Sequence, residues 1–204
     1  MTETIKLLLA DDQALVRGAL AALLELEPDL QVVAQVGRGD EVIAAAAESG
    51  AQVCLLDIEM PGLDGISAAA DLKAALPQVH SLIVTTFGRP GYLRRAVEAG
   101  ASGFVVKDTP AAELADAVRR VHAGMRVIDP TLATESLTDG LNPLTDRERD
   151  VLRAALPGAT VAVIARSVHL SAGTVRNYLS SAIGKTSAST RAEAAQIAEQ
   201  RGWL

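Results

Sequence analysis

Four carboxylates are spaced so that they could meet at one edge of a sheet. Asp11 and Asp12 follow a short apolar run, and Asp57 and Glu59 follow another. If both runs are parallel strands, their carboxyl ends share an edge, where the functional groups of such folds gather. Crowded carboxylates repel one another, and a hard cation that prefers oxygen ligands would relieve that repulsion. These residues therefore predict a Mg²⁺ site.

A cation and a hydroxyl could reach the same edge. Lys107 follows a later apolar run, and Thr85 ends another. A carboxylate can attack phosphorus while a metal and an ammonium group neutralise the phosphoryl oxygens, which leaves an acyl phosphate. Taken singly, each residue is more often an ordinary polar residue at a strand end. The complete set, in this order, favours phosphoryl chemistry with Asp57 as the nucleophile.

Alternating strand and helix patterns are expected to position these groups. The expected strands cover residues 5–10, 31–36, 53–56, 81–85 and 103–106. The expected helices cover residues 13–26, 40–48, 65–76, 90–98 and 110–122. Five strand–helix units with short connections, and strands that are almost continuously apolar, predict an α/β fold. Its parallel five-stranded sheet would be covered by helices on both faces.

Residues 1–123 resemble the receiver domains of two-component systems. The resemblance rests on Asp11-Asp12, on Asp57 with Met60-Pro61-Gly62, on Thr85 and on Lys107. It implies a flavodoxin-like fold and a phosphoryl group that Asp57 accepts from a sensor histidine kinase. The implied Mg²⁺ ligands are Asp12, Asp57 and the backbone carbonyl of Glu59, with help from Asp11. Thr85 and Phe104 would form a switch pair, in which the threonine approaches the phosphoryl group and the aromatic ring turns inward.

The rest of the chain changes character. Residues 124–141 lose the alternating pattern and are expected to be a linker, with a short helix near 130–137. Four helices are expected after it, at 145–156, about 160–167, 171–184 and 190–201. Thr145 and Glu148 have the spacing of a capping box at the start of the first of these helices, and Ser171 is a candidate N-cap for the third.

Residues 142–204 resemble the four-helix LuxR-type helix-turn-helix domain. The resemblance rests on residues 144–152, Ile164-Ala165, Leu170-Ser171 and Thr174-Val175-Arg176. Together with a receiver domain, it indicates the NarL/FixJ class of response regulators. A looser resemblance, carried by residues 87–92, residues 173–178 and Gly202-Trp203, is to regulators of membrane-lipid desaturation in Gram-positive bacteria. It does not identify the target gene.

The third of these helices is expected to enter the major groove of double-stranded DNA. Arg176 can pair with guanine and Asn177 with adenine, whereas Lys185 and Arg191 are better placed for phosphates. The candidate DNA contacts are Thr174, Arg176, Asn177, Ser180, Lys185 and Arg191. A solvated helix face is the alternative interpretation of the same pattern.

Charge is distributed unevenly along the chain, whose formal net charge is −6. Residues 1–123 hold 10 basic and 17 acidic side chains, whereas residues 142–204 hold 8 and 5. Affinity for DNA comes mainly from neutralised phosphates, so one copy of this weakly basic domain should bind poorly. We expect phosphorylation to promote a homodimer. Its receiver interface would be either the face of helix 90–98, strand 103–106 and helix 110–122, or the face of the first and fifth helices.

Other classes of protein fit the sequence less well. No apolar run approaches the roughly 20 residues that span a bilayer, and the N-terminus lacks a basic region, so a cytoplasmic protein is expected. The single cysteine, Cys54, is expected to be a buried structural thiol. A Mg²⁺-dependent phosphatase with Glu59 as proton donor and a scaffold with a degenerate site are the rivals. We expect no enzyme, because a phosphatase would leave the helix-turn-helix half without a role.

Overall fold

Parallel strands form the sheet that carries the candidate site. The computed structural model describes residues 4–86, 90–129, 142–156 and 158–204. The strands of this described part are β1 (Ile5–Ala10), β2 (Leu30–Val36), β3 (Val53–Leu56), β4 (His80–Thr85), β5 (Gly103–Val106) and β6 (Val127–Ile128). They pair in the order β2-β1-β3-β4-β5-β6, and every pairing is parallel. The predicted parallel α/β fold is confirmed.

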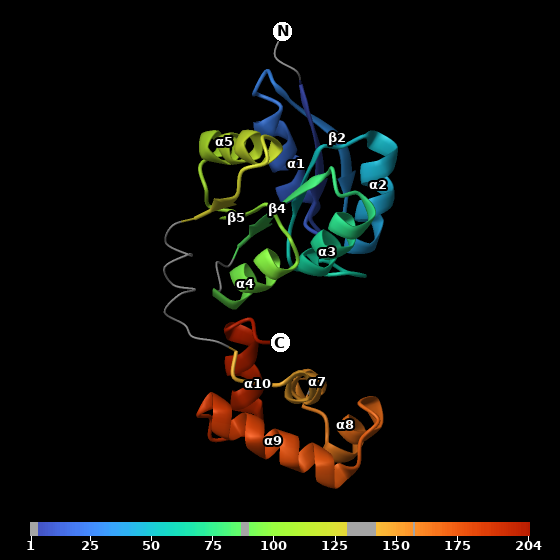
Figure 1. The fold of residues 1–204 in the computed structure, drawn as a ribbon, viewed down its shortest axis with the longest axis vertical. Coiled ribbons are helices and arrows are strands. Elements are labelled where there is room, and N and C mark those ends of the chain that lie inside the picture. The colour runs from blue at the N-terminus through green and yellow to red at the C-terminus, as the bar shows by residue number, and fades with distance from the viewer. Residues whose placement is uncertain (1–3, 87–89, 130–141, 157) are drawn as a thin grey trace. The chain divides into compact units, whose positions relative to one another are not determined.

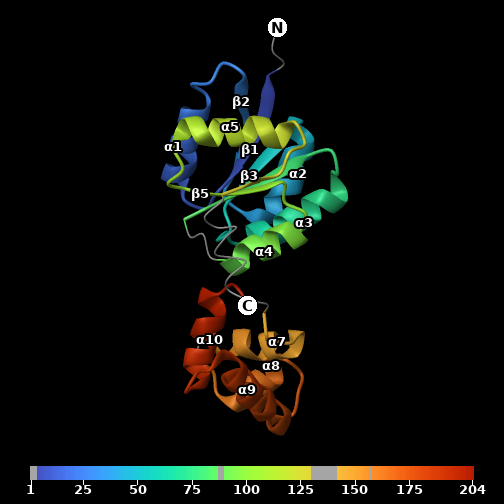
Figure 2. The ribbon, with the colours of Figure 1, turned by 60° about the vertical axis from the view of Figure 1, so that its left-hand side comes forward.

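Helices cover both faces of this sheet (Figures 1 and 2). They are α1 (Ala14–Leu24), α2 (Val42–Ser49), α3 (Gly65–Ala75), α4 (Pro90–Glu98) and α5 (Ala111–His122), with a 3₁₀ turn at Gly39–Glu41 before α2. One face packs against α1 and α5, and the other packs against α2, α3 and α4. Successive strand residues point to opposite faces, so both faces of a doubly covered strand must be apolar.

The central strand β3 illustrates this double burial. Val53 and Leu55 face the α1–α5 side, whereas Cys54 and Leu56 face the other side, and all four are buried. Burial raises the pKa of the Cys54 thiol to about 12, so the thiol stays protonated at neutral pH. The expectation of a structural cysteine is confirmed.

The sheet extends one strand further than the sequence pattern predicts. Gly103 and Phe104 of β5 pair with Val127 and Ile128 of β6, inside the segment that is expected to be a linker. A two-residue strand is too short to show the alternation on which the prediction of a strand relies. The sheet therefore has six strands in the described part of the chain, and the first residues after α5 belong to it. The predicted helix near 130–137 lies outside the described residues.

The helices that follow the sheet unit form a second compact unit, whose residues contact mainly one another. It consists of α7 (Asp146–Ala155), α8 (Val161–Ser167), α9 (Ala172–Thr186) and α10 (Arg191–Gln200), as the sequence predicts. Its apolar core draws on all four helices and on Trp203. The capping box at α7 is present: the Thr145 hydroxyl accepts from the backbone of Glu148, and the Glu148 carboxylate accepts from the backbone of Thr145. No helix of the described residues is long and apolar enough to cross a membrane.

Candidate functional site

Pairing of β1 with β3 brings the predicted acids together. Ala10 lies opposite Leu56, and the backbone amide of Asp57 donates to the carbonyl of Ala10 at 2.9 Å. The residues that follow the two strands therefore emerge side by side. Carboxylate oxygens of Asp11, Asp12 and Asp57 all lie within 4.8 Å of one another. Asp11 and Asp57 are buried, whereas Asp12 is exposed and leaves one side of the cluster open to solvent.

Lys107 reaches this cluster from the end of β5. Its ammonium Nζ lies 2.7 Å from Oδ2 of Asp11 and 3.2 Å from Oδ2 of Asp57. Burial raises the pKa of Asp57; the charge of Lys107 opposes this rise, and the charge of Asp11 adds to it. Burial alone would lower the pKa of Lys107, but its hydrogen bond to Asp11 and its attraction to both carboxylates outweigh this effect and raise the pKa. Lys107 is thus a fixed cation beside two buried carboxylates.

The two candidate switch residues lie on neighbouring strands. Thr85 is buried at the end of β4, and its carbonyl accepts a 2.7 Å hydrogen bond from the amide of Lys107. Phe104 on β5 lies opposite Ile83, two residues before Thr85 on β4. Its ring is fully buried and belongs to the core on the α4 side of the sheet. The aromatic side chain therefore occupies an inward position in this structure.

The loop after Asp57 depends on a glycine that the sequence analysis did not single out. A Cβ atom at Gly65 would lie 1.9 Å from the carbonyl oxygen of Asp57, so no side chain fits there. Asp64 caps α3 by accepting from the backbone amides of Ile66 and Ser67, each at 3.0 Å. The pair Asp64-Gly65 directly before an apolar helix is a sequence signal that could have identified this cap.

Gly65→Ala should disturb the site through this close approach. We expect the receiver unit to lose about 1–3 kcal/mol of its free energy of unfolding, because overpacking forces the backbone to shift. Gly18→Ala in α1 is the matched control: nothing lies within 4 Å of its added Cβ, and we expect neutral or slightly stabilising behaviour. Urea unfolding of both variants by far-ultraviolet circular dichroism tests the contrast, and equal stabilities would contradict it.

Glu59 takes no part in the acid cluster. Its side chain is exposed, and its carboxylate is not among the clustered oxygens of the described residues. A phosphatase would need this carboxylate near the nucleophile as a proton donor. The placement of Glu59 therefore gives that rival no support.

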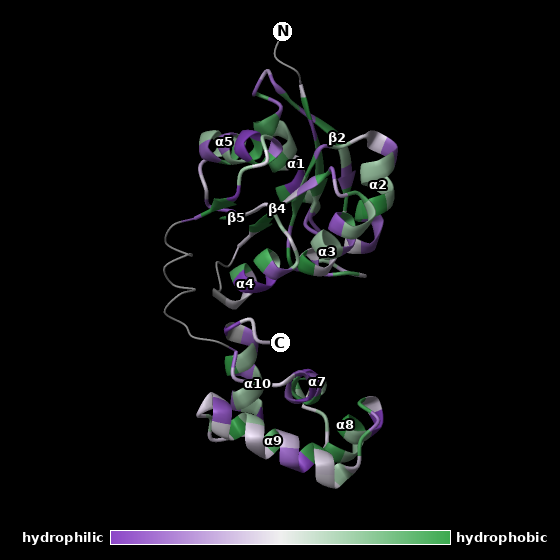
Figure 3. Ribbon diagram, viewed as in Figure 1, coloured by the Kyte–Doolittle hydropathy of each residue, from purple (hydrophilic) through white to green (hydrophobic). Residues whose placement is uncertain are grey.

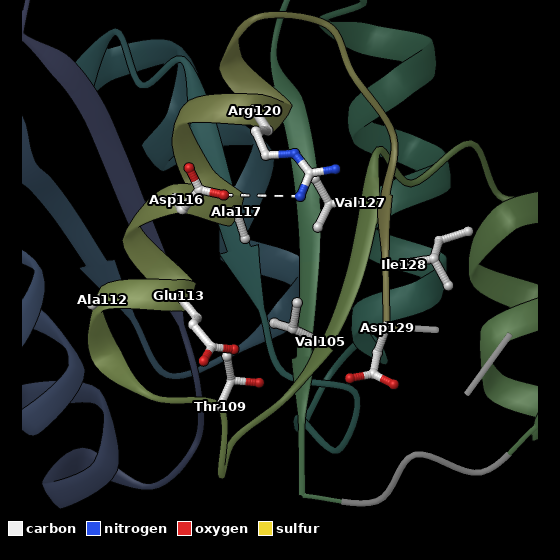
Figure 4. Close-up of a pocket in the computed structure, with 10 residues that line it drawn as sticks. All are labelled: Val105, Thr109, Ala112, Glu113, Asp116, Ala117, Arg120, Val127, Ile128 and Asp129. Carbon is white, nitrogen blue, oxygen red and sulfur yellow. Dashed lines mark ion pairs between the residues drawn. The ribbon is translucent and has the colours of Figure 1, made fainter. Parts of the chain in front are cut away.

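A larger cavity lies elsewhere on the receiver unit. It has a volume of about 410 Å³ and lies between α5 and the β5–β6 edge (Figure 4). Asp116 and Arg120 at its rim form a 3.8 Å ion pair between two exposed side chains. The acid cluster lines no part of this cavity, so the chemistry predicted from the sequence is located at the strand ends and not in the larger hollow.

The outward side of α9 carries the residues predicted to read DNA. Val175 and Leu179 are buried in the core of the second unit, whereas Arg176, Asn177 and Ser180 are exposed. This division follows the helical period, and it leaves three of the candidate DNA contacts on the exposed side. Arg176 and Asn177 are side chains of the types that pair with base edges in a major groove.

Two of the other candidate DNA contacts, Thr174 and Lys185, have polar neighbours that the sequence did not suggest. The hydroxyl of Thr174 lies 2.8 Å from that of Ser171, the N-cap of α9. The ammonium of Lys185 donates to the buried carboxylate of Glu148 at 2.7 Å. Arg191 is the first residue of α10 and is half-buried. The link between Glu148 and Lys185 is a feature that motif reasoning missed, because it joins residues 37 positions apart.

Comparison with known proteins gives a consistent result. The response regulator receiver domain family matches residues 7–119, and the luxR family of bacterial regulatory proteins matches residues 142–198. The chain is 45% identical over 202 residues to the Bacillus subtilis protein named uncharacterized transcriptional regulatory protein YvfU. This match covers 98% of this chain and all of the relative. It is 41% identical over 200 residues to the B. subtilis transcriptional regulatory protein DesR, and that match covers 98% of this chain and 99% of DesR.

A solved structure shows the same likeness over the whole chain. The crystal structure of response regulator ChrA, from a heme-sensing two-component system, is 30% identical, with a TM-score of 0.60. The match covers 98% of this chain and 99% of ChrA. The predicted family is confirmed, whereas the looser likeness to desaturation regulators stays a prediction, and residues 87–89 of its motif lie outside the described residues. This chain is a response regulator of two-component systems that joins a receiver domain to a LuxR-type DNA-binding domain.

Proposed function

We propose that Asp57 accepts a phosphoryl group from a phosphohistidine of a sensor histidine kinase. An oxygen of the Asp57 carboxylate forms a bond to phosphorus, the phosphorus–nitrogen bond breaks, and the electron pair stays on the histidine ring. The product is an acyl phosphate on Asp57. The single observation that carries this proposal is the ammonium of Lys107 within 3.2 Å of Asp57 and 2.7 Å of Asp11. A cation fixed there can neutralise the oxygens of the incoming group.

The acid cluster also fits a bound Mg²⁺. Three carboxylate oxygens lie within 4.8 Å of one another, and hard oxygen donors in a partly open site suit an ion that retains waters. Asp12 and Asp57, the backbone carbonyl of Glu59 and the nearby Asp11 are the groups proposed to hold it. When bound, Mg²⁺ would withdraw charge from the phosphoryl oxygens. Lys107 supplies the second positive charge, and Thr85 is placed at the neighbouring strand end to report the change, with Phe104 as its aromatic partner.

The proposed output is transcriptional control by a dimer on double-stranded DNA. In this proposal residues 1–123 are the phosphoacceptor domain, residues 124–141 the linker and residues 142–204 the DNA-binding domain, and the protein acts in the cytoplasm. Two copies of α9 would read half-sites one helical turn apart. The exposed Arg176, Asn177 and Ser180 support α9 as the reading helix. We propose no catalytic turnover, because the family is one of regulators and the acid cluster lacks Glu59 as a proton donor.

An apolar stripe on α1 supports one of the two dimer faces left open by the sequence. Leu15, Leu23 and Leu26 are 86%, 44% and 78% exposed, and they recur at helical spacing along one side of α1 and the turn after it. The exposed small residues Gly18 and Ala22 lie between them on the same side. Protruding leucines and a shallow strip of small residues on one surface are self-complementary, which is what a two-fold interface requires. The proposed occupant is the α1 face of a second copy.

Leu23→Asp should weaken that dimer. A charge at the centre of an apolar interface costs more than about 1.4 kcal/mol, so the dimer Kd in the presence of an acyl-phosphate mimic should rise about tenfold or more. Met125→Asp is the matched control, because Met125 is 48% exposed but lies outside α1. Sedimentation velocity at several concentrations measures both constants. A larger effect for Met125→Asp than for Leu23→Asp would move the interface away from α1.

One experiment tests the proposed function as a whole. The full chain is sedimented with and without beryllium fluoride, an acyl-phosphate mimic, in the presence of Mg²⁺, and its binding to DNA upstream of its own coding region is titrated under both conditions. We expect a shift toward dimer and a parallel gain in affinity for DNA. Unchanged self-association together with unchanged DNA affinity would overturn the proposal.

A further inference from the structure

Glu148 is a buried carboxylate with partners from two helices. Its side chain is only 4% exposed, although Glu148 lies in the first turn of α7, which is largely hydrophilic (Figure 3). Oε2 accepts from the backbone amide of Thr145 at 2.6 Å and from the ammonium of Lys185 at 2.7 Å. Oε1 accepts from the hydroxyl of Ser181 at 2.6 Å. Each oxygen is therefore matched by donors, as a buried charge requires.

Two of these donors, Ser181 and Lys185, belong to the last two turns of α9. Ser181 and Lys185 are one helical turn apart, so a single carboxylate can contact both only in one rotation of α9 relative to α7. Val175 and Leu179 fix the inner side of α9 by packing, and Glu148 fixes its last turns by polar contacts. The rotation of α9 determines which direction Arg176 and Asn177 face. The carboxylate is therefore coupled to the direction in which the reading side chains point.

Lys185 is paired through its ammonium with the carboxylate of Glu148. Its side chain is 34% exposed, so it lies at the surface of the unit, yet its charge is already balanced by Glu148. A lysine paired in this way adds no free positive charge with which to neutralise a DNA phosphate. Three arginines of α7 are likewise paired with acids. Arg149 contacts Asp146, and Arg147 and Arg153 each lie 3.7 Å from Asp150.

We propose that Glu148 is a positioning residue for the recognition helix α9, and that it holds Lys185 as a structural cation and not as a phosphate contact. The inference rests on the proposed function, in which α9 reads DNA. It replaces the expectation from sequence that Lys185 binds the DNA backbone. Arg191, at the start of α10, remains the candidate for that contact.

Salt dependence of DNA binding separates the two roles of a lysine. The logarithm of the association constant falls linearly with the logarithm of the salt concentration, with a slope of about −0.9 for each phosphate contacted. The probe is a short DNA duplex of mixed sequence, titrated with the full chain at several salt concentrations. Lys185→Gln should leave the slope of the wild-type chain unchanged, whereas Arg191→Gln should reduce its magnitude by about 0.9.

Glu148→Gln provides the converse measurement. The one oxygen of glutamine can still accept from the backbone amide of Thr145, and its NH2 group can donate to the hydroxyl of Ser181. Glutamine no longer balances the charge of Lys185, so the slope should become steeper by up to about 0.9. Glu193→Gln in α10 is the matched control for loss of one negative charge, because the exposed Glu193 carboxylate accepts from the backbone amide of Ser189 and pairs with no cation of the described residues. Glu193→Gln should leave the slope unchanged. Lys185→Arg should preserve the wild-type slope and stability, because it keeps the charge at that place.

The outcomes distinguish the inference from the proposed function. A slope reduced by Lys185→Gln as much as by Arg191→Gln would overturn the inference and leave DNA binding intact. A wild-type chain that fails to bind the duplex at low salt would overturn both. Fluorescence of Trp203, which is buried in the core of this unit, shows whether each variant is folded. If Glu148→Gln unfolds, the comparison of Lys185→Gln with Arg191→Gln decides the question alone.

Discussion

Asp57→Ala is expected to remove the response to phosphorylation completely. Without the carboxylate no acyl phosphate can form, so incorporation of label from a phosphorylated kinase or from acetyl phosphate should fall to background. The acyl-phosphate mimic should then change neither the sedimentation of the chain nor its affinity for DNA.

Removing a neighbour that only assists should cost less: Lys107→Ala should slow phosphoryl uptake by about 100-fold, the usual cost of one preorganised charge donor.

Glu59→Gln is the matched control for that experiment. Glu59 follows Asp57 by two residues, but its side chain is exposed and its carboxylate lies outside the acid cluster of the described residues. Phosphoryl uptake by this variant should therefore remain. Steady turnover of a small phosphate ester by the wild-type chain, lost in both Asp57→Ala and Glu59→Gln, would favour the phosphatase instead. Label that persists in Asp57→Ala would assign the phosphoacceptor to another residue.

The sequence predicts the acid cluster because parallel strands share an edge. Asp11 follows β1, Asp57 follows β3 and Lys107 follows β5. Because these strands are parallel, all three residues must emerge where the carboxyl ends of the strands meet. Periodicity does not give the order of the strands. That β1 lies directly beside β3, which makes the distance between Asp11 and Asp57 so short, depends on packing across the whole sheet. The resemblance to receiver domains implied a flavodoxin-like fold, and strands 1 and 3 are neighbours in such folds, whereas the local sequence pattern alone could not give this order.

Residues whose importance lies in close packing or distant contacts were harder to predict. The role of Gly65 depends on the position of a carbonyl in the preceding loop, and β6 is too short to carry a period. The capping box of Thr145 and Glu148 is local and was predicted correctly. The contacts from the same carboxylate to Ser181 and Lys185 cross 33 and 37 positions, so they follow from the tertiary fold.

Acid is expected to destabilise the DNA-binding unit through Glu148. Burial would raise the pKa of this carboxyl, but donors from Lys185, Ser181 and Thr145 outweigh it and lower the pKa from 4.5 to about 2. A carboxyl with a lowered pKa in the folded state stabilises that state above its unfolded pKa. The difference between the unfolded and folded pKa values of Glu148 corresponds to a contribution on the order of 3 kcal/mol to the free energy of unfolding. This contribution is fully present above about pH 5 and is lost as the pH falls toward 2.

Glu148→Gln should lose this pH-dependent contribution to the free energy of unfolding while it retains much of the packing. The unfolding of the unit can be followed by fluorescence, because Trp203 is the only tryptophan of the chain and is buried in the core of this unit. Other carboxylates titrate in the same range, so the informative quantity is the difference between wild type and variant in urea unfolding at pH 7 and near pH 3. The wild-type advantage should be largest at pH 7 and shrink in acid, because protonation removes the charge that Lys185 compensates. An advantage that stays constant between these pH values would mean that Glu148 contributes shape and hydrogen bonds but no net charge stabilisation.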